Sequence, residues 1–305
     1  MVEPILVIWN PKAGSVEANA AVRERLGRQP NVTLRETTSR DHARELAAEA
    51  VHAGAGLVVA AGGDGSVNSV VSGLAENLDN ARLAILPMGT GNDFARTLAM
   101  PPDPLEAVNV LLAPHPPMRR MDLVHVPRPD GDRHYINMAT GGNTGHALES
   151  LSDEVKRAWG PLAYVRGAVD MLGDLTVFDV RMRFDDGPAE QYAALNVFLA
   201  NGRTSGGGLP VAPRASPEDG LMDVIIIRDG TAIDLAALAA RFFVSDYLES
   251  ELIIYRRAQR VEIDAAPPLE FSADGDLIGP TPLTASVLPQ ALPVLVGPEY
   301  ATEVR

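Results

Sequence analysis

The chain has 305 residues, no cysteine and a formal net charge of −14 at pH 7. This length allows two domains with cores of their own. The lack of cysteine excludes disulfides, thiolate zinc sites and cysteine catalysis. The acidic balance argues against non-specific nucleic-acid binding and against broad attraction to an anionic membrane. The sequence shows no membrane span and no signal-peptide pattern, which predicts a cytoplasmic protein whose membrane contact is peripheral.

The first third of the chain alternates apolar strand patterns with helical patterns. Three strand-and-helix units precede residue 81, and a fourth follows. Gly54 and Gly56 end the second helix as C-cap glycines do. The predicted strands cover residues 5–9, 32–36, 57–61 and 83–86, and helices are predicted after residue 15 and over 41–53, 67–74 and 105–112. This alternation predicts a parallel sheet covered by helices on both faces.

The segment at residues 57–69, LVVAAGGDGSVNS, organises this half of the chain. A wholly apolar run predicts a strand buried on both faces. Gly62, Gly63 and Gly65 follow, and Ser66 stands where a helix N-cap is expected. Glycines allow a ligand to approach the backbone, and a helix N-terminus offers free N–H groups to an anion. A tight strand-to-helix turn with a solvated Asp64 is the alternative.

Similar loops follow two other strands. Residues 10–15, NPKAGS, place Lys12 after the first strand, and residues 87–96 place Thr90, Asn92 and Asp93 after the fourth. The Walker spacing is absent, so this is not the P-loop. In open α/β sheets the carboxyl ends of the strands bind ligands, and three glycine-containing loops are expected to converge there.

The pattern changes near residue 118. The stretch 114–121, PHPPMRRM, suits an inter-domain linker, and strands dominate after it. Strand density predicts an antiparallel β-sandwich as the second domain. The predicted strands include 177–184, 192–200, 221–228, 260–264, 269–273 and 292–296, with helices over 154–172 and 232–247.

Three short polar segments lie between the predicted strands of the second domain. Gly206, Gly207 and Gly208 form a flexible loop that could border a substrate. The local sequence of residues 218–220, EDG, predicts a turn. Residues 272–276, SADGD, read either as a hairpin turn or as a carboxylate pair for base catalysis and metal contact. The six histidines lack metal-binding spacing, and the sequence has no G-x-S-x-G elbow.

Together these segments resemble the diacylglycerol kinase catalytic family. The motifs that carry the resemblance are Asn10-Pro11-x-x-Gly14, the loop from Gly62 to Asn68, and Gly89-Thr90-Gly91-Asn92-Asp93-Phe94-Ala95. The resemblance covers nearly the whole chain. It implies an ATP-binding domain over residues 1–120, a β-sandwich lipid domain over 121–297 with the active site between them, and a tail over 298–305 that packs back on the first domain.

The resemblance also implies site residues. Asp64, Asp93 and Asp122 match acidic positions at the ATP–Mg²⁺ site, and Thr37 matches a nucleotide contact for which Thr38 is an alternative. A structural Mg²⁺ would be held by Ser216, Asp219 and Leu221. The nucleotide-contacting set is Asn10, Lys12, Gly14, Thr37, Gly62, Gly63, Asp64, Gly65, Ser66, Asn68, Ser69, Gly89 and Thr90.

Two positions depart from the family pattern. Ser66 replaces a threonine and keeps the hydroxyl, whereas Asp276 replaces the glutamate expected to act as general base. The resemblance implies phosphoryl transfer from Mg-ATP to a lipid hydroxyl, with Asp276 accepting the proton, Asp274 aligning the site, and Asp93 and Asp122 positioning the γ-phosphate. A soluble-acceptor kinase and a nucleotide-binding protein without catalysis are the alternatives. Homodimerisation and the identity of the lipid stay open.

Overall fold

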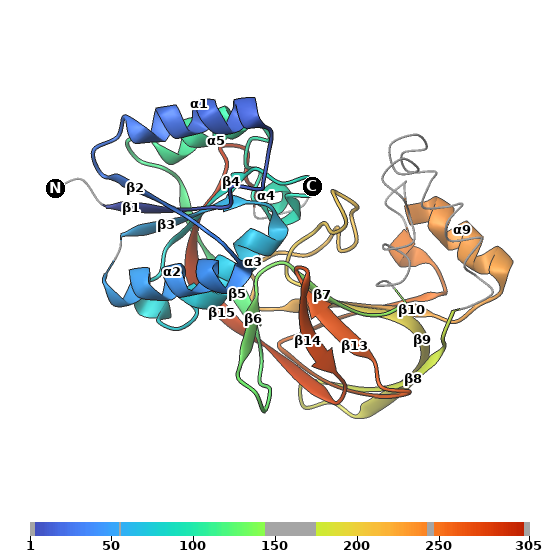
Figure 1. The fold of residues 1–305 in the computed structure, drawn as a ribbon. Helices are drawn as coiled ribbons and strands as arrows, with labels where there is room; N and C mark the ends of the chain where they lie inside the picture. The colour runs from blue at the N-terminus through green and yellow to red at the C-terminus, as the bar shows by residue number, and fades with distance from the viewer. Residues whose placement is uncertain (1–3, 55, 144–174, 243–246, 302–305) are drawn as a thin grey trace.

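The structure is a computed structural model that describes residues 4–54, 56–143, 175–242 and 247–301. Two lobes lie side by side, an α/β lobe formed by the first part of the chain and a β-rich lobe formed by the rest (Figure 1). The predicted helix over 154–172 lies outside the described residues. No helix among those described is long and apolar enough to cross a membrane.

The first lobe is built on a parallel sheet with strand order β4-β3-β1-β2. Helices α1 and α5 cover one face, and α2 and α3 cover the other (Figure 1). Strand β3 is buried along its whole length, as its apolar run predicts. The elements are β1 (Ile5–Trp9), α1 (Val16–Gly27), β2 (Val32–Glu36), α2 (Arg40–His52), β3 (Leu57–Gly62), α3 (Asp64–Leu74), β4 (Leu83–Pro87), α4 (Asp93–Thr97) and α5 (Pro104–Leu111), with a 3₁₀ turn over Leu78–Asn80.

Helix α3 begins earlier than the sequence indicates. Its N-cap is Gly63 and Asp64 is its first residue, so Ser66 lies within the first turn and is not the cap. A β-carbon on Gly62 would stand 2.3 Å from the Ser66 hydroxyl, which shows how tightly the chain turns here. The prediction failed because Ser66 uses its hydroxyl to accept a hydrogen bond from the Asn10 side chain, at 3.1 Å, and not to cap the helix.

The second lobe consists of antiparallel strands that enclose a second core. Buried residues of this core include Val180, Val197, Val224 and Phe271. The elements are β6 (Arg133–Tyr135), β7 (Met138–Gly142), β8 (Phe178–Phe184), β9 (Ala189–Ala200), β10 (Met222–Arg228), α9 (Ala232–Phe242), a 3₁₀ turn (Tyr247–Glu249), β11 (Ile253–Ala258), β12 (Arg260–Ala266), β13 (Glu270–Ala273) and β14 (Asp276–Pro280).

Two long strands, β5 (Met118–Val126) and β15 (Leu283–Leu295), join the lobes. Strand β15 pairs with β5 along most of its length and meets β4 in parallel at Val294 and Leu83. Residues 118–121, expected within a linker, therefore begin a strand. The end of β15 lies in the core of the first lobe, and Tyr300 packs against the same core. The two lobes thus share one hydrogen-bonded sheet, which fixes the glycine loops relative to the second lobe.

Candidate active site

The glycine loops meet at the carboxyl edge of the parallel sheet. A β-carbon on Gly89 would stand 2.4 Å from the α-carbon of Gly63, so the loops after β3 and β4 touch backbone to backbone. The Asn92 side chain closes the second loop by bonding both the N–H and the carbonyl of Gly89, at 2.9 and 2.7 Å. This contact leaves room only for glycine, as in a cradle that presents bare backbone to a phosphate.

The loop after β1 lies against the first turn of α3. Asn10 bonds Ser66, and its side-chain oxygen accepts a hydrogen bond from the Lys12 backbone at 3.0 Å. The Thr37 hydroxyl donates to the Trp9 carbonyl at 3.2 Å, which holds the end of β2 beside β1. Gly14 adopts a left-handed φ of 77°. Lys12 and Thr90 are exposed at this edge. The predicted nucleotide-contacting loops are therefore brought together.

Asp64 joins the loop after β3 to the loop after β4. Its Oδ1 accepts hydrogen bonds from the backbone of Asp93 at 2.7 Å and Phe94 at 3.4 Å. Partial burial, with a contribution from the Asp93 charge, raises the pKa of Asp64. A β-carbon on Gly91 would stand 2.6 Å from Asp64 Oδ2. Carboxylate oxygens are ligands that Mg²⁺ prefers, so Asp64 fits a role in holding a Mg-nucleotide beside the glycine loops.

Asp93 has a different set of contacts. The two oxygens of its buried carboxylate accept hydrogen bonds from the backbone of Gly207 and Gly208, at 3.0 and 2.6 Å. Thr204 adds a hydrogen bond from its hydroxyl to the Asp93 carbonyl at 3.0 Å. Asp93 thus anchors the triple-glycine loop of the second lobe to the first lobe.

Asp122 lies apart from these loops. Its carboxylate accepts hydrogen bonds from Gly220 at 2.7 Å and Gln290 at 2.6 Å, and burial raises its pKa. The structure therefore groups Asp122 with the turn at 216–221 and not with Asp64 and Asp93. This turn carries the predicted structural metal ligands.

The turn at 216–221 fits a metal poorly. One Asp219 oxygen accepts a hydrogen bond from Leu221 at 3.0 Å, and the other is paired with the guanidinium of Arg257. The same guanidinium lies 3.7 Å from the buried Asp223 carboxylate. The Arg257 guanidinium therefore already occupies the Asp219 carboxylate oxygen that a cation would need.

The Asp274-Gly275-Asp276 turn reaches from the second lobe to the glycine loops. Asp274 adopts φ 48° and accepts hydrogen bonds from the backbone of Asn137 and Met138, at 3.1 and 2.9 Å. Burial, opposed by those bonds, raises the pKa of Asp274 to about 7, and the Asp64 charge adds to the increase. Asp274 therefore fixes the turn and lies within electrostatic range of Asp64.

Asp276 contacts the first lobe directly. Its Oδ2 accepts a hydrogen bond from the Asn68 amide at 2.8 Å, and its Oδ1 is paired with Arg40. This pairing is not predictable from the sequence, because no local motif includes Arg40 and the two residues lie 236 positions apart. A carboxylate from the second lobe thus stands beside the loop that follows β3, despite being one methylene shorter than a glutamate.

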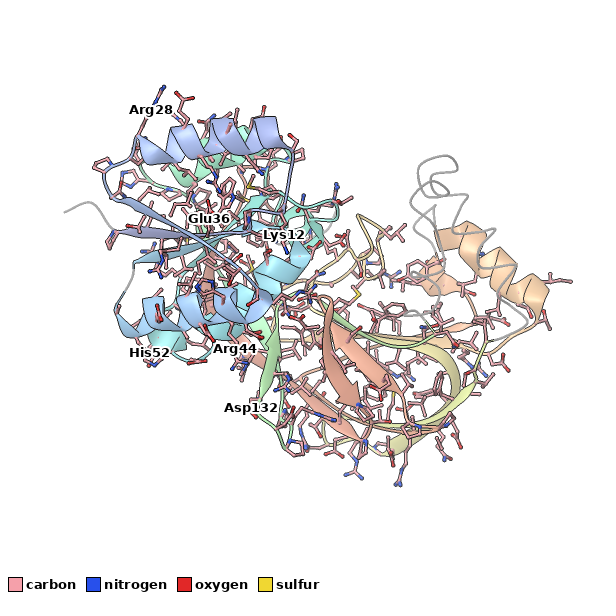
Figure 2. The ribbon with its side chains drawn as sticks, in the orientation of Figure 1. Lys12, Arg28, Glu36, Arg44, His52 and Asp132 are labelled. Carbon is pink, nitrogen blue, oxygen red and sulfur yellow. The ribbon has the colours of Figure 1, made fainter. Side chains whose placement is uncertain are left out.

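A cavity of about 400 Å³ opens beside Asp276. Most of the residues that line it have polar or charged side chains, and its apolar residues include Leu277, which is 68% exposed. Burial and the neighbouring His125 lower the pKa of His134 in its wall to about 4. Figure 2 shows Arg44 on the half of α2 nearer the β5–β6 hairpin, which carries Asp132. The lining residues are Arg40, Asp41, Arg44, Asn68, Ser69, Ser72, Arg133, His134, Tyr135, Ala273, Asp276, Leu277 and Ile278.

Comparison with known proteins decides the family. Residues 4–126 match the model of the diacylglycerol kinase catalytic domain, and residues 141–296 match that of the YegS C-terminal NAD kinase beta sandwich-like domain. The chain belongs to the diacylglycerol kinase catalytic family. This membership places it among the kinases and confirms the predicted α/β domain followed by a β-sandwich domain.

Named relatives agree with this family. A "Probable lipid kinase YegS-like" from Pseudomonas aeruginosa is 32% identical over 291 residues, 95% of this chain and 93% of the relative. A "Diacylglycerol kinase" from Staphylococcus aureus is 28% identical over 280 residues, 90% of this chain and 87% of the relative. The crystal structure of a putative diacylglycerol kinase from Bacillus anthracis has a TM-score of 0.79 at 24% identity, covering 98% of this chain and 97% of its own, and shares the fold.

Proposed function

We propose that this protein is an ATP-dependent lipid kinase that transfers the γ-phosphoryl group of Mg-ATP to a lipid hydroxyl. The observation that carries the proposal is the position of Asp276, which comes from the β-sandwich and contacts Asn68 beside the glycine loops. A phosphate held by those loops and a hydroxyl held beside Asp276 would meet at this boundary. Positioning of this kind supplies much of the catalysis in phosphoryl transfer.

The transfer step uses residues on both sides of the boundary. The acceptor oxygen bonds to the γ-phosphorus, the bond from that phosphorus to the bridging oxygen of ADP breaks, and the hydroxyl proton passes to Asp276. The backbone N–H groups of the glycine loops and Lys12 offset phosphate charge. Asp64 would hold Mg²⁺, which when bound neutralises charge on the phosphates. Asp274 fixes the turn that carries Asp276.

The nature of the cavity supports a second candidate. A lipid site would be expected to be lined by Leu, Val, Phe and Met, yet Arg40, Arg44, Arg133 and His134 line this one. The charged side chains among the lining residues favour a kinase for a soluble acceptor. The exposed Leu277 at the cavity favours a lipid, because an apolar lip can contact a membrane without charge attraction.

Label transfer from γ-labelled Mg-ATP separates these functions. The acceptor panel would contain diacylglycerol, monoacylglycerol, sphingosine, ceramide and phosphatidylglycerol in mixed micelles, together with soluble NAD. A labelled lipid is the expected outcome. Label on NAD alone would favour the soluble-acceptor kinase. Measured ATP binding with no labelled product would favour a nucleotide-binding protein without catalysis.

A further inference from the structure

Arg40 lies between the phosphate side and the acceptor side of the site. It is the first residue of α2, which Ser39 caps by accepting a hydrogen bond from the His42 backbone. The Arg40 Nη1 donates to the Gly275 carbonyl at 2.8 Å and pairs with Asp276. On its other side, Nη2 lies 2.9 Å from the position that a β-carbon on Gly65 would take. One guanidinium thus contacts the turn over residues 274–276 of the second lobe and lies beside the first turn of α3.

The electrostatics of this position indicate an anion. Gly65 belongs to the first turn of α3, where unsatisfied N–H groups carry partial positive charge. A guanidinium beside a helix N-terminus is repelled by it unless a negative group lies between them. Asp276 supplies such a charge on one side, and the Asp64 carboxylate of the first turn of α3 accepts hydrogen bonds from the backbone of Asp93 and Phe94. An arginine fork beside the first turn of a helix is suited to phosphate oxygens.

Arg40 is also open to a ligand. Its side chain is 57% exposed despite the contacts to Gly275 and Asp276. A side chain longer than hydrogen at position 65 would crowd the guanidinium, so Gly65 leaves the approach from α3 free. The transferred group must lie between the glycine loops and Asp276, and this is where the Arg40 guanidinium stands.

We propose that Arg40 binds the γ-phosphoryl group during transfer, and that its ion pair with Asp276 keeps it in place before nucleotide binds. This inference rests on the proposed kinase function and adds a catalytic residue to it. The guanidinium would bond the outer oxygens of the phosphoryl group, which carry charge in the transition state. It would hold the group on the line between the nucleotide and the acceptor hydroxyl.

The affinities for Mg-ATP and Mg-ADP, measured by calorimetry, test this inference in the full chain. Arg40→Gln should weaken ATP binding roughly tenfold, as expected for loss of one charge-assisted contact at an exposed site, and should leave ADP affinity within about twofold. Arg40→Lys should recover part of the ATP affinity. Arg28→Gln removes the same charge at the far end of α1 and should change neither affinity (Figure 2).

The outcomes separate this inference from the proposed function. Equal losses of ATP and ADP affinity would overturn it, since Arg40 would then merely support the loop. Unchanged ATP affinity in Arg40→Gln would overturn it as well. Asp276→Asn keeps the turn and the hydrogen bond from Arg40 to the Gly275 carbonyl, so it should retain ATP affinity while losing transfer. A wild-type protein that binds ATP and labels no acceptor would contradict the kinase function, while the ratio of ATP to ADP affinities would still decide the role of Arg40.

Discussion

The amide of Asn68 donates a hydrogen bond to the Asp276 carboxylate at 2.8 Å, and the two residues are 208 positions apart in the sequence. Asn68 lies on the helix that begins at the glycine loop, whereas Asp276 begins a strand of the β-sandwich. Asn68 is buried, so its side chain has little freedom. This contact sets the position of the candidate base relative to the candidate phosphate site.

Removal of the Asp276 carboxylate should stop transfer and spare nucleotide binding. Asp276→Ala takes away the proton acceptor, and we expect the transfer rate to fall by roughly 100-fold or more, as is typical for loss of a general base. Label transfer and ATP affinity would be measured together. Asp186→Ala, an exposed aspartate in the β8–β9 turn, is the control. Transfer at the wild-type rate in Asp276→Ala would rule out this role.

The contact between the two glycine loops should tolerate no side chain. In Gly89→Ala the new β-carbon would stand 2.4 Å from the Gly63 α-carbon, so the loops must separate. We expect a loss of about 1–3 kcal/mol in the free energy of unfolding, together with weaker ATP binding. Gly27→Ala is the control, because nothing lies within 4 Å of its β-carbon position. Urea unfolding would compare the variants, and equal midpoints would show that the loops are not packed as described.

Asp274 should make stability depend on pH. Its pKa is raised from 3.8 to about 7 in the folded protein, so the unfolded chain releases this proton first as the pH increases. The free energy of unfolding should therefore fall between about pH 4 and pH 7, by at most about 1.4 kcal/mol per pH unit, and the loss should be complete above pH 7.

Asp274→Asn would isolate this contribution. Asparagine tolerates the left-handed backbone of this position and does not titrate. Urea unfolding of both proteins at intervals from pH 4 to pH 8 should give a shallower decline for the variant. The comparison is needed because burial also raises the pKa of Asp223, to about 6, which adds a decline of the same sign. Parallel profiles for the two proteins would contradict the shifted pKa of Asp274.

Arg257 should take the place of a cation at the turn over residues 216–221. Arg257→Gln removes the guanidinium that pairs with Asp219. The same change takes away the positive charge that lies 3.7 Å from the buried Asp223 carboxylate. We expect destabilisation by roughly 1–3 kcal/mol, partly reversed by millimolar Mg²⁺. Arg256→Gln removes the neighbouring arginine, which pairs with Glu190 instead, and serves as the control.

Thermal unfolding in EDTA and in Mg²⁺ would test this role. The wild-type midpoint should be the same in both, since the arginine already compensates the carboxylates. A wild-type midpoint that falls by several degrees in EDTA would show that the turn holds a metal despite Arg257.

Local sequence patterns sufficed for much of the first lobe. The apolar run that became β3, the Ser39 cap of α2 and the Asp103 cap of α5 depend on contacts between near neighbours in the chain. The strand predicted over 57–61 and the helices predicted over 41–53 and 105–112 are therefore present, although the two cap residues were not predicted. Backbone conformation and short-range hydrogen bonds favour the same structure in these segments. The cap of α3 was misplaced because Ser66 bonds Asn10, which lies on another loop.

The sequence by itself determined that glycine loops follow parallel strands and gather at one edge, because strand, turn and helix signals act over a few residues. It also predicted the carboxylates at 274 and 276. Only the tertiary structure decided that Arg40 meets Asp276, 236 positions away, and that Asp122 belongs with the turn at 216–221. These contacts arise because β15 carries the chain back to β4, and such long-range pairing depends on the packing of both lobes, which no local pattern specifies.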